Sequence, residues 1–258
     1  MIKTPAPSVN EVAINTRKLP LSNVHIRRAI SYALDRQKLI ALCFPGYKMA
    51  AGYVPPGLGG YNPEIKTATY DIEKAQEEIK LSGLSKNEIA RPILLIRPDN
   101  HACAGNFASF FESSLKRIGM NVTVKHLPLD ALFKIYYNTL DYDMISWNTS
   151  GEHPEAFFVL NNFYSNHPDN YTGFKSRSYD EVVSKVLRAE DRYERFNLYK
   201  KLQEIIQQEV PTIPLYYNMY ESIYQHYIRG VGRSPYSRYV TTMKTIYFEN
   251  NGNGKSVQ

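Results

Sequence analysis

Stretches of helical and strand-like hydrophobic patterning alternate along most of this 258-residue chain. Residues 21–44 carry apolar side chains at helical spacing, with Ser22 or Asn23 in the N-cap position, and predict one helix that ends before Pro45. Residues 70–83 predict a second helix, which Asp71 would cap and a glycine would stop.

The remaining elements follow the same alternation. Helical spacing predicts further helices over residues 104–119, 129–140, 178–190 and 192–210. Alternating patterns predict strands over residues 11–15, 91–98, 120–127 and 142–147, two strands or a hairpin over 212–228, and a last strand over 239–250. Strands that alternate with helices indicate an α/β fold, with a mixed sheet flanked by helices.

Composition and charge exclude some function classes. The chain is 43% hydrophobic with a net charge of +6, and its lysines and arginines are interleaved with 25 acidic residues. This scatter favours solvated faces over a phosphate-binding surface, so we expect no nucleic-acid partner. The 21 tyrosines suit wet cavities and interfaces, although they suit strands equally well.

The two cysteines and the chain start carry weaker signals. Cys43 and Cys103 fit no metal-binding spacing, and we expect two buried thiols, with pairing in an oxidising compartment as the alternative. No apolar run reaches the roughly 18 residues that a membrane span needs. The first residues contain no apolar signal region, so the sequence leaves secretion undecided.

Motifs of enzyme chemistry are not found in the sequence. It contains no G-x-S-x-G, H-E-x-x-H, Walker or dinucleotide-binding pattern, and its six histidines are dispersed. We therefore expect no catalytic residue, no metal site and no cofactor, and a hydrolase of unknown type ranks below any binding function.

The only tryptophan stands where a predicted strand gives way to a polar loop, in "DYDMISWNTSGEHPEAFF" (residues 141–158). A tryptophan at a strand end either packs in the core or lines a binding cleft. The sequence alone leaves both roles open for Trp147.

Several blocks in order resemble the bacterial extracellular solute-binding proteins of the peptide/nickel group, the peptide-binding components of ABC importers. The blocks are "INTRKLPLSNVHIRRAISYALDRQKLI", "VPPGLGGYNPEI", "YDIEKAQEEIKLSGL", "LKRIGMNVTV", "YDMISW", "RFNLYKKLQEIIQQEVPTIPLYY" and "VGRSPYSRY". The resemblance implies a periplasmic-binding-protein-like α/β lobe without its first lobe. Residues 1–11 would be a lead or hinge, 12–222 the second lobe, and 223–258 a segment that returns to the missing first lobe. Unpaired, that segment is expected to self-associate, to pack on the lobe or to be poorly ordered.

The resemblance also implies a site and partners. A peptide or related small solute would lie between two lobes and pass to an inner-membrane ABC permease from the periplasm. The ligand-contacting candidates are Trp147, Asn148, Ser150, Glu152, His101, Arg97, Tyr216 and Tyr217. Ser150 stands where the family carries an aspartate for the peptide's α-amino group, and only Glu152 is near enough to replace that charge. A modified peptide, another solute, or a chaperone-like role in holding polypeptides therefore stays open.

For individual candidates the residues allow a second interpretation. His101 fits an exposed loop position, and Arg97 fits either an exposed strand end or a bidentate contact with a ligand carboxylate. Tyr216 and Tyr217 fit either the core or a position from which a hydroxyl reaches the ligand.

Overall fold

A six-stranded mixed sheet organises the structure, a computed structural model that describes residues 2–100, 103–151, 153–231 and 245–249. The strand order is β2-β6-β1-β5-β3-β4. The strands are β1 (Ile2–Ile14), β2 (Lys48–Met49), β3 (Pro92–Pro98), β4 (Asn121–Leu127), β5 (Met144–Ser150) and β6 (Thr212–Ser222). Strands β3, β4 and β5 run parallel, while β1 is antiparallel to both of its neighbours.

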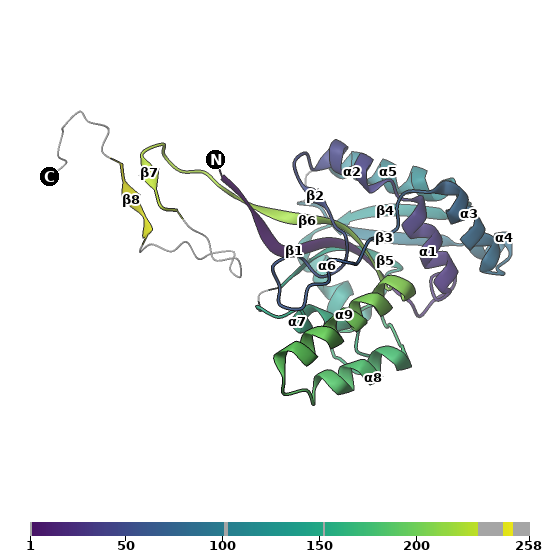
Figure 1. Ribbon diagram of the computed structural model, residues 1–258. Helices are drawn as coiled ribbons and strands as arrows, with labels where there is room; N and C mark the ends of the chain where they lie inside the picture. The colour runs from purple at the N-terminus through teal and green to yellow at the C-terminus, as the bar shows by residue number, and fades with distance from the viewer. Residues whose placement is uncertain (1, 101–102, 152, 232–244, 250–258) are drawn as a thin grey trace.

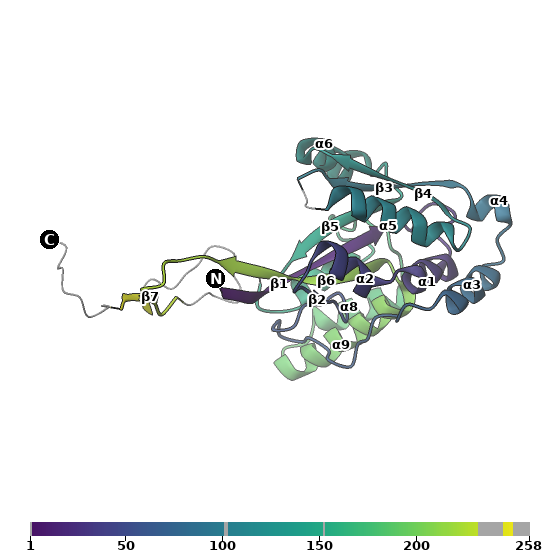
Figure 2. The same cartoon turned by 90° about the horizontal axis from the view of Figure 1, so that it is seen from above.

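Helices cover both faces of this sheet (Figures 1 and 2). The α5 face is covered by α1 (Val24–Ala33), α2 (Arg36–Cys43), α3 (Ile72–Leu81) and α5 (Ala104–Lys116), with short α4 (Lys86–Ile89) beside them. The α9 face is covered by α6 (Leu129–Lys134), the π-helix η1 (Ile135–Thr139), α7 (Phe157–Leu160), the 3-10 helix η2 (Asn161–Phe163), α8 (Arg177–Val186) and α9 (Arg192–Glu209). The α/β class predicted from the sequence is therefore confirmed.

Successive side chains of the central strands pack in separate hydrophobic cores on the two faces of the sheet. Val12 and Ile14 of β1 pack in the core under α1 and α5. Ala13, which lies between them, packs with Leu132 of α6 on the opposite face. A further core joins α7, α8 and α9 to the loop that precedes α3. The central strands are therefore buried on both faces of the sheet.

Several predicted boundaries differ from the structure. Strand β5 ends at Ser150 rather than at Trp147, and the two strands or hairpin predicted over residues 212–228 are replaced by the single strand β6, because β7 pairs with β8 instead. The single helix predicted over residues 21–44 is divided into α1 and α2, because Leu34 adopts an extended backbone and the Asp35 side chain caps a new helix by accepting from the Lys38 amide. The strand predicted from Glu11 begins much earlier, at Ile2.

The C-terminal part of the described chain leaves the sheet. Strand β6 runs to Ser222, and two-residue strands β7 (Ile228–Arg229) and β8 (Tyr247–Phe248) pair with each other. Figure 1 shows this pair well apart from the six-stranded sheet. Most of the last strand predicted over residues 239–250 lies outside the described residues.

Candidate functional site

The predicted site residues of β5 are divided between the two faces of the sheet. Successive side chains of a strand point to opposite faces. Trp147 packs with α6 and η1 on the α9 face. Asn148 lies on the α5 face, and Ser150, two residues on, is opposite Ser8 of β1. The structure therefore places Trp147 and Asn148 next to each other in the middle of β5, on opposite faces of the sheet.

Trp147 is half-buried within a cluster of aromatic rings. Its ring is stacked on Tyr136, with ring centroids 5.4 Å apart and an angle of 26° between the planes. Phe133 meets the indole edge-on at 5.6 Å, and Phe133 also stacks on Tyr137 at 5.7 Å. Phe133 and Tyr137 are 38% and 54% exposed, so this aromatic shelf (Phe133, Tyr136, Tyr137 and Trp147) offers ring surface to a ligand.

Sequence reasoning missed the part of the shelf that lies outside β5. The signal was available, because Phe133, Tyr136 and Tyr137 have i, i+3, i+4 spacing, which places them on one side of a helix. They lie where α6 passes into η1, and π-helical turns are frequent at functional sites.

A polar row crosses the sheet on the α5 face. The Asn218 side-chain nitrogen of β6 donates to the Asn148 Oδ1 and lies 3.0 Å from the Ser8 Oγ of β1. These three side chains come from adjacent strands and present amide and hydroxyl groups, which suit the donors and acceptors of a peptide backbone.

Arg97 is deeply buried at the carboxyl end of β3, on the α5 face. It is 1% exposed, and its guanidinium lies 3.9 Å from the centre of the Phe107 ring of α5. Burial lowers the pKa of Arg97, and it also lowers the pKa of His126, its register neighbour on β4. The interpretation of Arg97 as an exposed strand end is wrong.

Tyr216 and Tyr217, which are neighbours on β6, point to opposite faces of the sheet. Tyr216 is 2% exposed and packs against Phe44, with ring centroids 4.2 Å apart. The Tyr217 hydroxyl lies 3.1 Å from both the Gly52 amide nitrogen and the Gly52 carbonyl oxygen, and burial raises the pKa of Tyr217 to about 12. In the described structure, both therefore serve packing and loop attachment. The predicted contacts of His101 and Glu152 lie outside the described residues.

The cysteines form a disulfide, so the expectation of two unpaired thiols is wrong. Cys43 at the end of α2 is bonded to Cys103 directly before α5, with an S–S distance of 2.04 Å and a Cα–Cα distance of 5.4 Å. Sixty residues separate them, and their proximity arises only from the packing of α2 beside α5. The bond fixes the chain at the start of α5.

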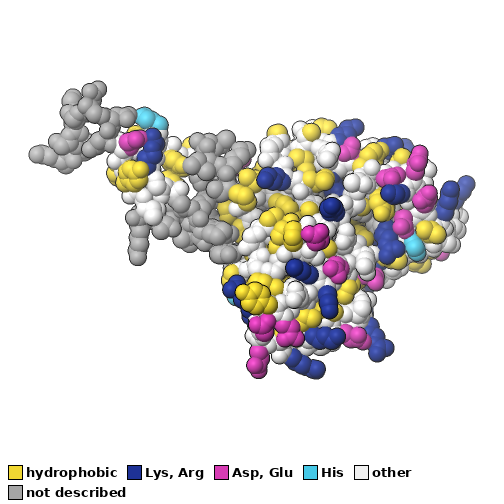
Figure 3. Space-filling view, in the orientation of Figure 1, with side chains coloured by type: hydrophobic (Ala, Val, Ile, Leu, Met, Phe, Trp, Pro, Cys, Tyr) yellow, Lys and Arg dark blue, Asp and Glu magenta, His cyan; other side chains and the backbone are white. Residues whose placement is uncertain are grey.

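The part of the chain that the structure describes was also compared with the requirements of a metal site and of a membrane-spanning helix. Its residues contain no group of three or more His, Cys, Asp or Glu side chains that could hold a metal ion. None of the described helices is long and apolar enough to cross a membrane. Acidic and basic side chains are interleaved on the surface shown in Figure 3.

Comparison with known proteins gives one consistent family. A family model described as bacterial extracellular solute-binding proteins, family 5 Middle, matches residues 1–171. The peptide transport periplasmic protein SapA of Salmonella typhimurium is 23% identical over 238 residues, which are 90% of this chain and 43% of SapA. The dipeptide-binding protein of Escherichia coli is 23% identical over 83% of this chain and 41% of its own length.

A solved structure supports the same fold. The putative peptide binding protein AppA from Clostridium difficile matches with a TM-score of 0.84 and 20% identity, over 96% of this chain and 52% of that one. The chain thus spans about half the length of the proteins that it matches. Because the family model covers well over half of it, the chain belongs to the bacterial extracellular solute-binding proteins, family 5.

Proposed function

We propose that this chain forms one wall of the ligand cleft in the substrate-binding component of an ABC-type peptide importer, without catalysis. The observation that carries the proposal is the family match over residues 1–171. Relatives named for peptide transport and dipeptide binding support peptides as the ligand class. On this proposal the protein acts in the periplasm and delivers its ligand to a membrane permease.

The proposed domain division gives residues 12–222 to the second lobe, residues 1–11 to a lead or hinge and residues 223–258 to a segment that joins a first lobe. Strand pairing supports the hinge, because residues 2–5 of β1 run antiparallel to residues 219–222 of β6. Figure 1 shows both strands leaving the helical body together. A paired ribbon of this kind can bend as a unit when two lobes close.

The proposed ligand contacts combine residues from the two faces of β5. The aromatic shelf would pack against an apolar side chain of the peptide, and Asn148 with Asn218 would bond its backbone. Ser150 carries no charge for an α-amino group, so within this proposal Glu152 is the candidate counter-charge. Arg97 remains the candidate for the carboxylate of the ligand.

A second candidate function is the capture of a non-peptide solute. The observation in its favour is the exposure of Phe133 and Tyr137, because open ring faces bind any planar apolar group. The peptide hypothesis ranks first because these relatives are named for peptide transport and dipeptide binding.

Nuclear magnetic resonance tests the proposal even where one lobe binds weakly. The indole N–H of Trp147 gives a unique signal, since the chain contains one tryptophan. Alanyl-phenylalanyl-alanine should shift this signal and the side-chain amide signals of Asn148 and Asn218, with a dissociation constant of about 1 mM. Glucose should shift none of them. Unchanged signals at a peptide concentration several times that value would overturn the proposed wall.

A further inference from the structure

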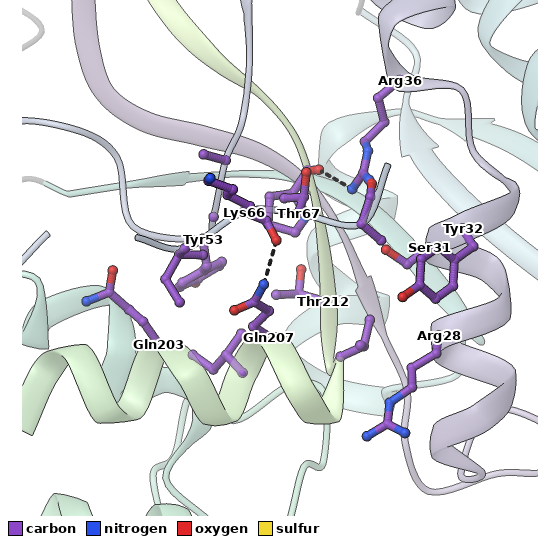
Figure 4. A pocket seen from close by; sticks show the side chains of 17 residues that line it. Arg28, Ser31, Tyr32, Arg36, Tyr53, Lys66, Thr67, Gln203, Gln207 and Thr212 are labelled. Atoms are coloured by element: carbon purple, nitrogen blue, oxygen red, sulfur yellow. Dashed lines mark hydrogen bonds between the residues drawn. The ribbon is translucent and has the colours of Figure 1, made fainter. Parts of the chain in front are cut away.

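A cavity of about 210 Å³ lies between α1, α9 and the loop of residues 51–68, and none of the predicted site residues that the structure describes lines it. Its volume corresponds to about seven water molecules at liquid density. Figure 4 shows Arg28 from α1, Gln207 from α9 and Tyr53 and Thr67 from the loop around this space.

The charged side chains that the structure describes in the cavity lining are all positive. Arg28, Arg36 and Lys66 line the cavity, and no Asp or Glu is found among the lining residues that the structure describes. Arg36 is 2% exposed, and its guanidinium donates to the carbonyl oxygens of Ala68 and Pro214. These two bonds occupy two of the five N–H donors of a guanidinium.

Arg36 has no carboxylate partner among the residues that the structure describes. Arg27 is a useful comparison, because it is similarly buried but lies 3.8 Å from the Glu209 carboxylate. Burial lowers the pKa of Arg36 to about 10, with no carboxylate to oppose the shift. Arg36 is therefore still cationic at neutral pH, and an uncompensated buried charge is costly.

One carboxyl group lies behind the wall of the cavity. Glu11 accepts a hydrogen bond from the Thr212 hydroxyl, and Thr212 itself is a lining residue. Burial raises the pKa of Glu11 to about 7, so near neutral pH it supplies only part of a negative charge. An anion that enters the cavity would meet a net positive wall.

The rest of the lining combines an apolar surface with the uncharged polar side chains of Ser31, Thr67, Gln203, Gln207 and Thr212. Ile65, Ile206 and Val210 are buried side chains at its wall, and the rings of Tyr32 and Tyr53 add aromatic surface. Water or a simple inorganic ion would leave this surface without a matching partner. A small ligand with one anionic group and an apolar body would match both parts of the lining.

We propose that this cavity, here called the arginine cavity, binds a small organic carboxylate. Arg36 and Arg28 hold its carboxylate oxygens, and its apolar body packs against Ile65 and Ile206. This site is separate from the proposed peptide wall, so its ligand can bind whether or not a peptide is present.

Isothermal titration calorimetry tests the proposal with benzoate as the probe. Benzamide has the same shape without the charge, and inorganic phosphate has the charge without the apolar body. Benzoate should bind at least about tenfold more tightly than either, because a charge-assisted bond and ring burial act together. Benzamide or phosphate binding as tightly as benzoate would overturn the proposal.

Substitutions in the lining test whether benzoate binds in the arginine cavity. Arg28→Gln and Lys66→Gln alter a half-buried and an exposed side chain, so the fold should survive both changes. Their combination should weaken benzoate binding about tenfold or more. Arg177→Gln with Lys185→Gln is the matched control, since both residues lie on α8, away from the cavity.

A filling variant tests the same site without removing a charge. Ser31→Leu places a branched side chain in the lining and should abolish benzoate binding, while circular dichroism verifies that the chain is folded. Benzoate should leave the Trp147 indole signal unmoved. Full benzoate affinity in folded Ser31→Leu, or in the Arg28 and Lys66 double variant, would place any binding elsewhere and refute the arginine cavity.

Discussion

The buried carboxyl of Glu11 makes the stability of this lobe depend on pH. Glu11 is 3% exposed in the middle of the sheet, with the hydroxyls of Thr149 and Thr212 donating to it. Burial raises its pKa from 4.5 to about 7 despite these two hydrogen bonds, which lower it. No ion pair to Glu11 is found among the described residues, so the folded chain holds this side chain best when it is protonated.

Proton binding by Glu11 sets the direction and the size of the pH dependence of stability. Between 4.5 and about 7 the folded chain keeps a proton that the unfolded chain has released, so stability falls as the pH rises through this window. At about 1.4 kcal/mol per pH unit, the full loss is about 3 kcal/mol. Most of it, about 2.5 kcal/mol, falls between about pH 5 and about pH 8.

The assay is urea unfolding at both pH values, with the free energy of unfolding compared between the wild-type chain and Glu11→Gln. The amide is close to a neutral glutamic acid in shape, so the variant should be about 2 to 3 kcal/mol less sensitive to pH than the wild type. Glu204→Gln is the control, since Glu204 is exposed on α9. If Glu11→Gln retains the full pH dependence of the wild type, Glu11 is not the group responsible.

Three further changes test other contacts. Replacing Cys43 and Cys103 with serine removes a disulfide that closes a loop of 60 residues. Loop entropy predicts that the free energy of unfolding in urea falls by about 4 kcal/mol, and a fall below about 1 kcal/mol would contradict this account. Gly60→Ala should lower the melting temperature and cost over about 1 kcal/mol of stability, because the φ of Gly60 is +86° and a Cβ there would lie 2.4 Å from the Tyr199 ring. An unchanged melting temperature would show that the ring moves freely. Arg27→Met should cost about 3 kcal/mol, since Arg27 donates to four backbone carbonyls, two at the end of α9 and two in the segment before α1. The m-value of urea unfolding should stay constant, and a loss under about 1 kcal/mol would mean that water replaces those bonds.

Local signals predicted the parts of the fold that depend on neighbours in sequence. Asp71 caps α3 by accepting from the Lys74 amide, and Gly83 adopts the positive φ of a helix stop. The early half of β1 was missed because Pro5 and Pro7 argue against a strand. The structure accommodates these prolines where the register between β1 and β6 shifts, an irregularity that depends on the partner strand.

Less of the candidate site could be predicted from the sequence, because it also depends on contacts between distant segments. The prediction of a strand at Trp147 is confirmed, because the alternating pattern beside it is local, but the prediction that Trp147 ends this strand is wrong, since β5 continues to Ser150. The disulfide, the burial of Arg97 and the approach of Asn218 to Asn148 all depend on residues far apart in the chain. No pattern within one segment contains that information, so only the assembled sheet reveals these contacts.

The separation of Trp147 and Asn148 by one sheet position has an evolutionary consequence. Strand register has a period of two residues, so loss of one residue between Asp143 and Trp147 would exchange the faces that the two side chains occupy. The indole would then turn toward α5 and the amide toward η1. A single-codon deletion could thus rewrite the chemistry of both faces at once, whereas point substitutions would have to change each position separately.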